Sequence, residues 1–135
     1  MDVLGLLEQA GIQPSAQRVA VGRYVLVTRE HPSADHVFAR VKDALPGLSR
    51  ATVYNTLNLF VDKGLLKALV LAEGRVVFDP DTSPHHHLLD EESGAIHDIQ
   101  WHALEVRGID GLDGFDVAEH QVVLRGRARK KQRRA

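Results

Sequence analysis

The stretch that most constrains the fold is a predicted helix over residues 49–63 together with the two short apolar runs that follow it. Ser49 provides an N-cap, and three apolar residues recur at i, i+4 and i+7 along one face: Val53, Leu57 and Phe60. The runs LLKALVL and RVVFD are separated by Ala-Glu-Gly, which predicts a hairpin. The sequence therefore predicts a helix that leads directly into a two-stranded hairpin.

Three further helices are predicted before this unit, within residues 2–10, 14–30 and 31–47. This is the element order of a winged helix-turn-helix: several helices, then a helix with a polar face, then a hairpin. In such a module the second helix enters the DNA major groove. The alternative is a helical bundle in which this polar face is simply solvated.

The charges divide the chain into three parts. Residues 1–78 carry nine basic and seven acidic side chains, whereas residues 79–124 carry one arginine against eleven acids and hold six of the eight histidines. From residue 125 onward there are seven basic side chains and no acid. We predict an α+β protein with a DNA-binding domain at 1–80, a small second domain at 81–126, and a basic, disordered tail at 127–135.

Within the second part, the stretches HHHLLD, AIHDIQ and DVAEHQVVLRGRA have strand-like patterns, and WHALEVRGIDGLDG is at most a short helix interrupted by glycines. The chain has no cysteine, which excludes disulfides, thiolate zinc sites and thiol redox switches. Neither a spanning apolar run nor a signal peptide is evident, so no membrane association and a cytoplasmic location are expected.

The histidine run at residues 85–87 predicts a metal site. On a strand, His85 and His87 point to one face and His86 to the other, and Asp98 in the next strand can face the first pair. Imidazoles with carboxylates suit iron, manganese, zinc, nickel or copper. A hydrolytic zinc enzyme or a small iron oxygenase would need similar ligands, and three adjacent histidines can also be a solvated loop.

The chain resembles the ferric-uptake-regulator (Fur) family of metal-dependent bacterial repressors. The resemblance rests on HPSADHVF, LSRATVYNTLNLF followed by KGLL, VFDPDTSPHHH, GAIHDI and FDVAEHQVVLRG, and it runs from about Gly11 to about Gly126. It implies an N-terminal winged-helix DNA-binding domain at 1–80 and a C-terminal α/β dimerisation and metal-sensing domain at 81–126. It also implies a homodimer that represses transcription by binding double-stranded DNA at A·T-rich inverted repeats. It also implies a regulator, not an enzyme.

The resemblance implies a regulatory site for Fe²⁺ or Mn²⁺, with Zn²⁺ able to enter in vitro. Its five ligands map to His31, Asp79, His85, His87 and Asp98. A second metal site of the family maps to His86, Glu105 and His120, although Pro84 stands where relatives carry a histidine. The remaining histidines match no ligand position and are expected at the surface: His36, His97 and His102.

The polar side chains around the predicted recognition helix are the expected DNA contacts: Arg18, Arg50, Thr52, Tyr54 and Asn55. Many relatives hold a structural zinc with four cysteines, which this chain lacks. The chain resembles the peroxide sensors (PerR-like) in three features: the missing cysteines, Asp98 and Asn55. In those sensors, iron-catalysed oxidation of the histidines that correspond to His31 and His85 releases the metal. The haem-responsive iron regulators (Irr-like) share the histidine run and are the alternative.

Overall fold

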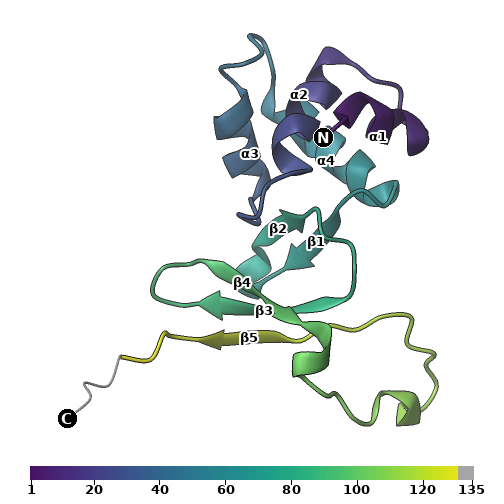
Figure 1. Ribbon diagram of the computed structural model, residues 1–135, viewed down its shortest axis with the longest axis vertical. Coiled ribbons are helices and arrows are strands. Elements are labelled where there is room, and N and C mark those ends of the chain that lie inside the picture. Colours follow the sequence, from purple (N-terminus) through teal and green to yellow (C-terminus); the bar gives the residue numbers. More distant parts are fainter. Residues whose placement is uncertain (131–135) are drawn as a thin grey trace. The chain divides into compact units, whose positions relative to one another are not determined.

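The computed structural model describes residues 1–130, and its contacts divide the chain into two compact units, Met1–Thr82 and a second that begins at Ser83 (Figure 1). The predicted roles of these units, DNA binding and dimerisation, stay predictions. Of the predicted tail, residues 127–130 are exposed and have no regular structure, and residues 131–135 lie outside the described residues. None of the helices in the described range has the length and apolarity needed to cross a membrane.

Four helices build most of the first unit: α1 (Val3–Gln9), α2 (Ala16–Val25), α3 (Ala34–Val41) and α4 (Arg50–Asp62). Each begins after a capping side chain whose oxygen accepts the amide N–H three residues later; the caps are Asp2, Ser15, Ser33 and Ser49. The helices predicted within residues 14–30 and 31–47 are shorter than those segments, because turns follow Val25 and Val41.

The core of the first unit lies between α2, α3 and α4. The stripe predicted for α4 is fully buried, since Val53, Leu57 and Phe60 are 0% exposed. Val21 and Val25 from α2 and Val37 and Val41 from α3 belong to the same core cluster. Burial of one face of α4 fixes its opposite, polar face toward solvent, which is the arrangement that a winged helix-turn-helix requires.

The predicted hairpin is confirmed. Strands β1 (Lys67–Val70) and β2 (Val76–Asp79) pair antiparallel, with Lys67 opposite Asp79 and Val70 opposite Val76. The 3₁₀ turn η1 (Ala72–Gly74) joins them, and Glu73 and Gly74 adopt positive φ angles of 62° and 73°. The pairing places Asp79 at the end of the hairpin away from this turn.

The second unit contains a three-stranded sheet in the order β4-β3-β5. Strands β3 (His85–Asp90) and β4 (Ile96–Gln100) are antiparallel, and β3 and β5 (Val123–Gly126) are parallel (Figure 1). The chain between β4 and β5 contains two short 3₁₀ turns, η2 (Trp101–Ala103) and η3 (Ile109–Gly111). The prediction of a strand over residues 116–128 was wrong for all but Val123–Gly126, because these are the residues that pair in register with β3. The carbonyl of Val122, just before β5, still accepts the N–H of His87 at 3.0 Å.

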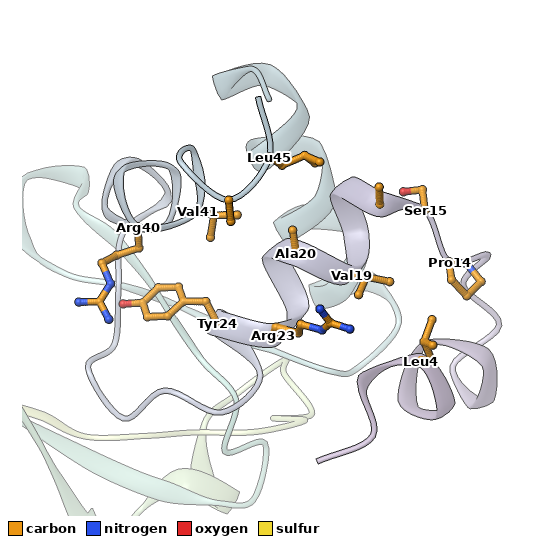
Figure 2. A pocket seen from close by; sticks show the side chains of 12 residues that line it. Leu4, Pro14, Ser15, Val19, Ala20, Arg23, Tyr24, Arg40, Val41 and Leu45 are labelled. Atoms are coloured by element: carbon orange, nitrogen blue, oxygen red, sulfur yellow. The ribbon is translucent and has the colours of Figure 1, made fainter. Parts of the chain in front are cut away.

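A surface groove of about 730 Å³ lies over α1, α2 and α3 in the first unit (Figure 2). Apolar side chains such as Leu4, Val19 and Leu45 line it, together with the polar side chains of Tyr24 and Arg40. The guanidinium carbon of Arg40 lies 5.1 Å from the centroid of the Tyr24 ring, a cation–π contact that joins α3 to α2.

Candidate metal centre and DNA-contacting face

His31 lies in the loop between α2 and α3, and the fold of the first unit brings Asp79 beside it. The backbone N–H of Phe78 in β2 donates to the carbonyl of Pro32 at 2.9 Å, so the end of the hairpin is attached to this loop. His31 Nε2 and Asp79 Oδ2 are 3.2 Å apart, and both side chains are buried. Asp79 Oδ1 accepts the N–H of Asp81 at 2.9 Å, which orients the carboxylate.

The backbone at His31 is strained. Its φ angle is 52°, in the left-handed region that residues with a Cβ rarely adopt, and such a residue costs about 1–3 kcal/mol. The neighbouring Glu30 anchors the loop, because its Oε2 accepts the hydroxyl of Tyr24 at 2.9 Å and lies 3.3 Å from His36 Nε2. The Tyr24 hydroxyl bond is also the main reason that the pKa of Glu30 is lowered. Contacts from α2 and α3 thus hold the strained loop in place.

In the second unit, β3 and β4 bring two imidazoles and a carboxylate together. His87 is paired with Asp98 in the sheet register, and Asp98 Oδ1 lies 3.5 Å from His85 Nε2 and 3.7 Å from His87 Nε2. The two imidazole centroids are 4.5 Å apart. The period-two alternation predicted from sequence, with His85 and His87 facing Asp98, is therefore present in the structure.

The donor chemistry of these groups fits a divalent transition-metal ion. His85 Nδ1 lies 2.7 Å from the carbonyl oxygen of Ser83, which assigns the ring N–H to Nδ1 and leaves Nε2 as the nitrogen that could bind a metal ion. Metal-binding histidines in proteins commonly donate their other N–H to a backbone carbonyl in this way. Two ligands bound at about 2.1 Å to one ion are separated by roughly 3–3.5 Å, close to the Nε2 to Oδ1 separations found here.

Two of the three residues predicted for a second metal site, His86 and His120, lie beside Trp101. The His86 ring is stacked on Trp101 with centroids 4.7 Å apart, and Trp101 lies 4.7 Å from the His120 ring. His86 Nδ1 accepts the N–H of Val122 at 2.9 Å, while Glu105 pairs with Arg107 at 3.0 Å. Burial, followed by the nearby charge of His120, lowers the pKa of His86. His86 and Glu105 thus already have protein partners. The second metal site stays a prediction.

The three histidines that were expected at the surface are exposed. His97 and His102 lie on β4 and η2, and His36 lies on α3. His36 contacts Glu30 rather than any carboxylate of the predicted ligand set. In contrast, His31, His85 and His87 face carboxylates of the predicted ligand set.

The side chains predicted to contact DNA lie on α4 and at the start of α2. Tyr54 and Asn55 are exposed on α4, while Thr52 and Asn55 line a groove of about 380 Å³ together with Arg18 of α2. Arg18 Nη1 donates to the carbonyl of Gln13 at 2.8 Å. Arg50, the first residue of α4, forms an ion pair of 2.7 Å with Asp35.

Sequence reasoning missed the contact to Asp35. From the sequence, Asp35 is an acid in the first turn of α3, which stabilises a helix N-terminus and predicts nothing about α4. Its contact with Arg50 spans 15 residues and depends on the packing of α3 on α4. The sequence carries only a weak signal for this contact, namely an acid in one predicted helix and an arginine at the start of the next.

The family model for the ferric uptake regulator family matches residues 9–125, which is most of the 135-residue chain. The chain belongs to this family. A peroxide-responsive repressor, PerR, from Staphylococcus aureus is 35% identical over 122 residues, which cover 89% of this chain and 82% of that protein. The PerR-like resemblance seen in the sequence is therefore confirmed.

Two solved structures support the fold. The ferric uptake regulator from Pseudomonas aeruginosa, solved with manganese, has a TM-score of 0.73 and 25% identity, covering 96% of this chain and 100% of the other. The Campylobacter jejuni peroxide stress regulator has a TM-score of 0.67 and 26% identity, covering 98% of this chain and 100% of the other. The predicted α+β class, a winged helix-turn-helix followed by a small C-terminal domain, is confirmed.

Family membership decides between the broad classes of function. Members of this family are metal-dependent transcriptional regulators that bind DNA as dimers, and they are not enzymes. The alternative of a small metal-dependent oxygenase or hydrolase is therefore wrong. The enzyme alternative arose because imidazole and carboxylate ligands serve both catalytic and regulatory metal sites.

Proposed function

We propose that this protein is a metal-dependent repressor that responds to peroxide. One Fe²⁺ or Mn²⁺ ion would be held by His31 and Asp79 from the first unit and by three residues from the second: His85, His87 and Asp98. The observation that carries the proposal is the placement of two imidazole Nε2 atoms within 3.7 Å of one carboxylate oxygen on adjacent strands. Zn²⁺ also binds imidazole and carboxylate ligands and is expected to compete in vitro.

The split of the ligand set between two units supports a regulatory role. His31 and Asp79 are attached to α3 and to the hairpin of the DNA-binding unit, and the other ligands belong to the sheet of the second unit. Ligands from both units on one ion would favour a single orientation of the units, and so a single spacing of the two α4 helices in a dimer. Loss of the ion would remove that restraint.

The exposed face of α4 supports double-stranded DNA as the partner. We propose that α4 of each subunit of a homodimer enters the major groove of one half of an A·T-rich inverted repeat. Tyr54 would pack on a thymine methyl group, Arg50, Thr52 and Asn55 would contact base edges or phosphates, and Arg18 would bind a phosphate. Binding to chromosomal DNA implies a location in the cytoplasm.

The response to peroxide would take place on the ligand imidazoles. A bound ferrous ion supplies the one-electron chemistry by which peroxide becomes an oxidant at the site. The net change is the insertion of one oxygen atom into an imidazole C–H bond of His31 or His85, with the second peroxide oxygen leaving as water and the ring supplying two electrons. An oxidised ring is a weaker ligand, so the ion is released and DNA is freed. Manganese, which does not support this chemistry, would protect the same residues.

A DNA-retardation assay tests the proposal. The full chain is mixed with a duplex selected from a random library, with Fe²⁺, Mn²⁺, Zn²⁺ or haem, before and after a low dose of peroxide. We expect Mn²⁺ and Fe²⁺ to promote binding, and peroxide to abolish binding of the iron form alone. Asp98→Asn should weaken the metal dependence, whereas His97→Gln, a change of the exposed neighbour on β4, should not. Control by haem alone would favour the haem-responsive alternative and overturn the proposal.

A further inference from the structure

Asp35, in the first turn of α3, contacts two side chains that we expect to meet DNA. Its Oδ1 accepts a hydrogen bond from Arg50 Nη1 at 2.7 Å and one from the Tyr54 hydroxyl at 3.3 Å. Arg50 and Tyr54 are four residues apart, so they lie on the same face of α4. A single carboxylate oxygen therefore links the first two turns of α4 to α3.

Phe38 adds a second contact to the same guanidinium group. The Cζ atom of Arg50 lies 4.8 Å from the centroid of the Phe38 ring. Asp35 and Phe38 are three residues apart and share a face of α3. Arg50 thus lies between a carboxylate and an aromatic ring, which restricts the rotamers of a long side chain. Asp35 engages Nη1, and the other N–H donors of the guanidinium group remain available for DNA.

Stabilisation of the fold does not account for this arrangement. The ion pair is exposed, with 63% of the Arg50 side chain and 65% of the Asp35 side chain accessible, and exposed pairs contribute little to stability. An acid in the first turn stabilises the helix by interacting with the helix dipole, whatever the direction of its side chain. Neither effect requires one carboxylate to contact two residues of another helix. We therefore expect the double contact of Asp35 to act on the orientation of Arg50 and Tyr54.

We propose that Asp35 is a positioning residue for DNA recognition. It holds Arg50 and the Tyr54 hydroxyl in the orientation in which they meet base edges, and its negative charge disfavours nonspecific approach of phosphates to Arg50. Asp35 thereby raises the ratio of specific to nonspecific DNA affinity. This inference rests on the proposed function, because it requires α4 to read DNA.

The test compares two DNA probes with the full, Mn²⁺-loaded chain. One is a duplex selected from a random library by the wild-type protein, and the other is a scrambled duplex of the same base composition. We expect Asp35→Asn to lower the specificity ratio about fivefold to tenfold, partly through tighter binding of the scrambled duplex. Asp43→Asn removes the same charge from an exposed position in the same unit and should leave the ratio within about twofold.

A second background separates positioning from charge alone. In a chain carrying Arg50→Ala and Tyr54→Phe, the groups that Asp35 orients are gone, and Asp35→Asn should no longer lower the ratio. A drop of the same size in that background, or an unchanged ratio for Asp35→Asn alone, would overturn the positioning role. If the wild-type chain selects no sequence from the library, the proposed function itself fails, and that outcome is seen before any variant is measured.

Discussion

At the scale of single residues, alternation along a strand was enough to predict how three of the candidate metal ligands face one another. A period of two places His85 and His87 on one face and His86 on the other, and the register of β3 with β4 brings Asp98 to the first pair. The contact between Asp35 and Arg50 could not be predicted, because it joins two helices whose packing is set by the core. Local patterns predict contacts between side chains on neighbouring strands more readily than contacts between helices.

Tyr54 provides a test of the DNA-contacting face. Its side chain is 45% exposed on α4, and its burial on folding is too small for truncation to unfold the chain. Tyr54→Ala should cost about 1–3 kcal/mol of affinity for the selected duplex if the ring packs on a base. Fluorescence anisotropy with Mn²⁺-loaded protein measures this. The control is Val27→Ala, an exposed apolar residue after α2. Equal affinity of folded Tyr54→Ala and wild-type protein would show that α4 does not read DNA through Tyr54.

At the scale of elements, helices and the hairpin were predictable because each has local start and stop signals. The serine caps and apolar stripes identified α3 and α4, and the paired apolar runs identified β1 and β2. The chain from Trp101 to Gly114 has neither signal, since glycines interrupt its periodicity. The strand-like pattern over residues 116–128 forms a strand only where the chain pairs in register with β3, at Val123–Gly126.

The basic tail that follows β5 can be tested as an element. Residues 127–135 contain six of the seven basic side chains after residue 124, and we expect them to add nonspecific attraction to phosphates. Truncation after Gly126 should reduce the slope of log K against log salt by roughly 1 to 3, with little loss of discrimination between duplexes. Binding measured between about 50 and 200 mM salt gives this slope. An unchanged slope would leave the tail with a solubilising or oligomer-stabilising role only.

At the scale of the whole molecule, the chain needs another source of dimer stability than a four-cysteine zinc site, since it has no cysteine. In the described residues β5 is an edge strand, and Val123 and Leu124 are 36% and 40% exposed. An edge strand with exposed apolar side chains can pair with a second copy of the chain. We therefore expect a dimer that does not depend on bound metal.

Chelation tests this expectation. If the proposed metal ion joins the two units, treatment with EDTA should loosen their orientation, but it should leave a dimer at micromolar concentration. Sedimentation velocity with and without EDTA reports the oligomer, and small-angle scattering reports the change of shape. A chain that becomes monomeric in EDTA would show that metal, rather than the sheet, holds the subunits together.

The central claim is that peroxide acts on the ligand imidazoles, and peptide mass spectrometry tests it most directly. Protein loaded with Fe²⁺ is given a low dose of peroxide and digested, while DNA binding is measured on the same sample. We expect one added oxygen atom on the peptide that contains His31 or His85, and a parallel fall in DNA affinity, with neither change in Mn²⁺-loaded protein. The exposed His97 and His102 should stay unmodified at that dose. An iron-loaded protein that keeps both its mass and its DNA affinity would contradict the account.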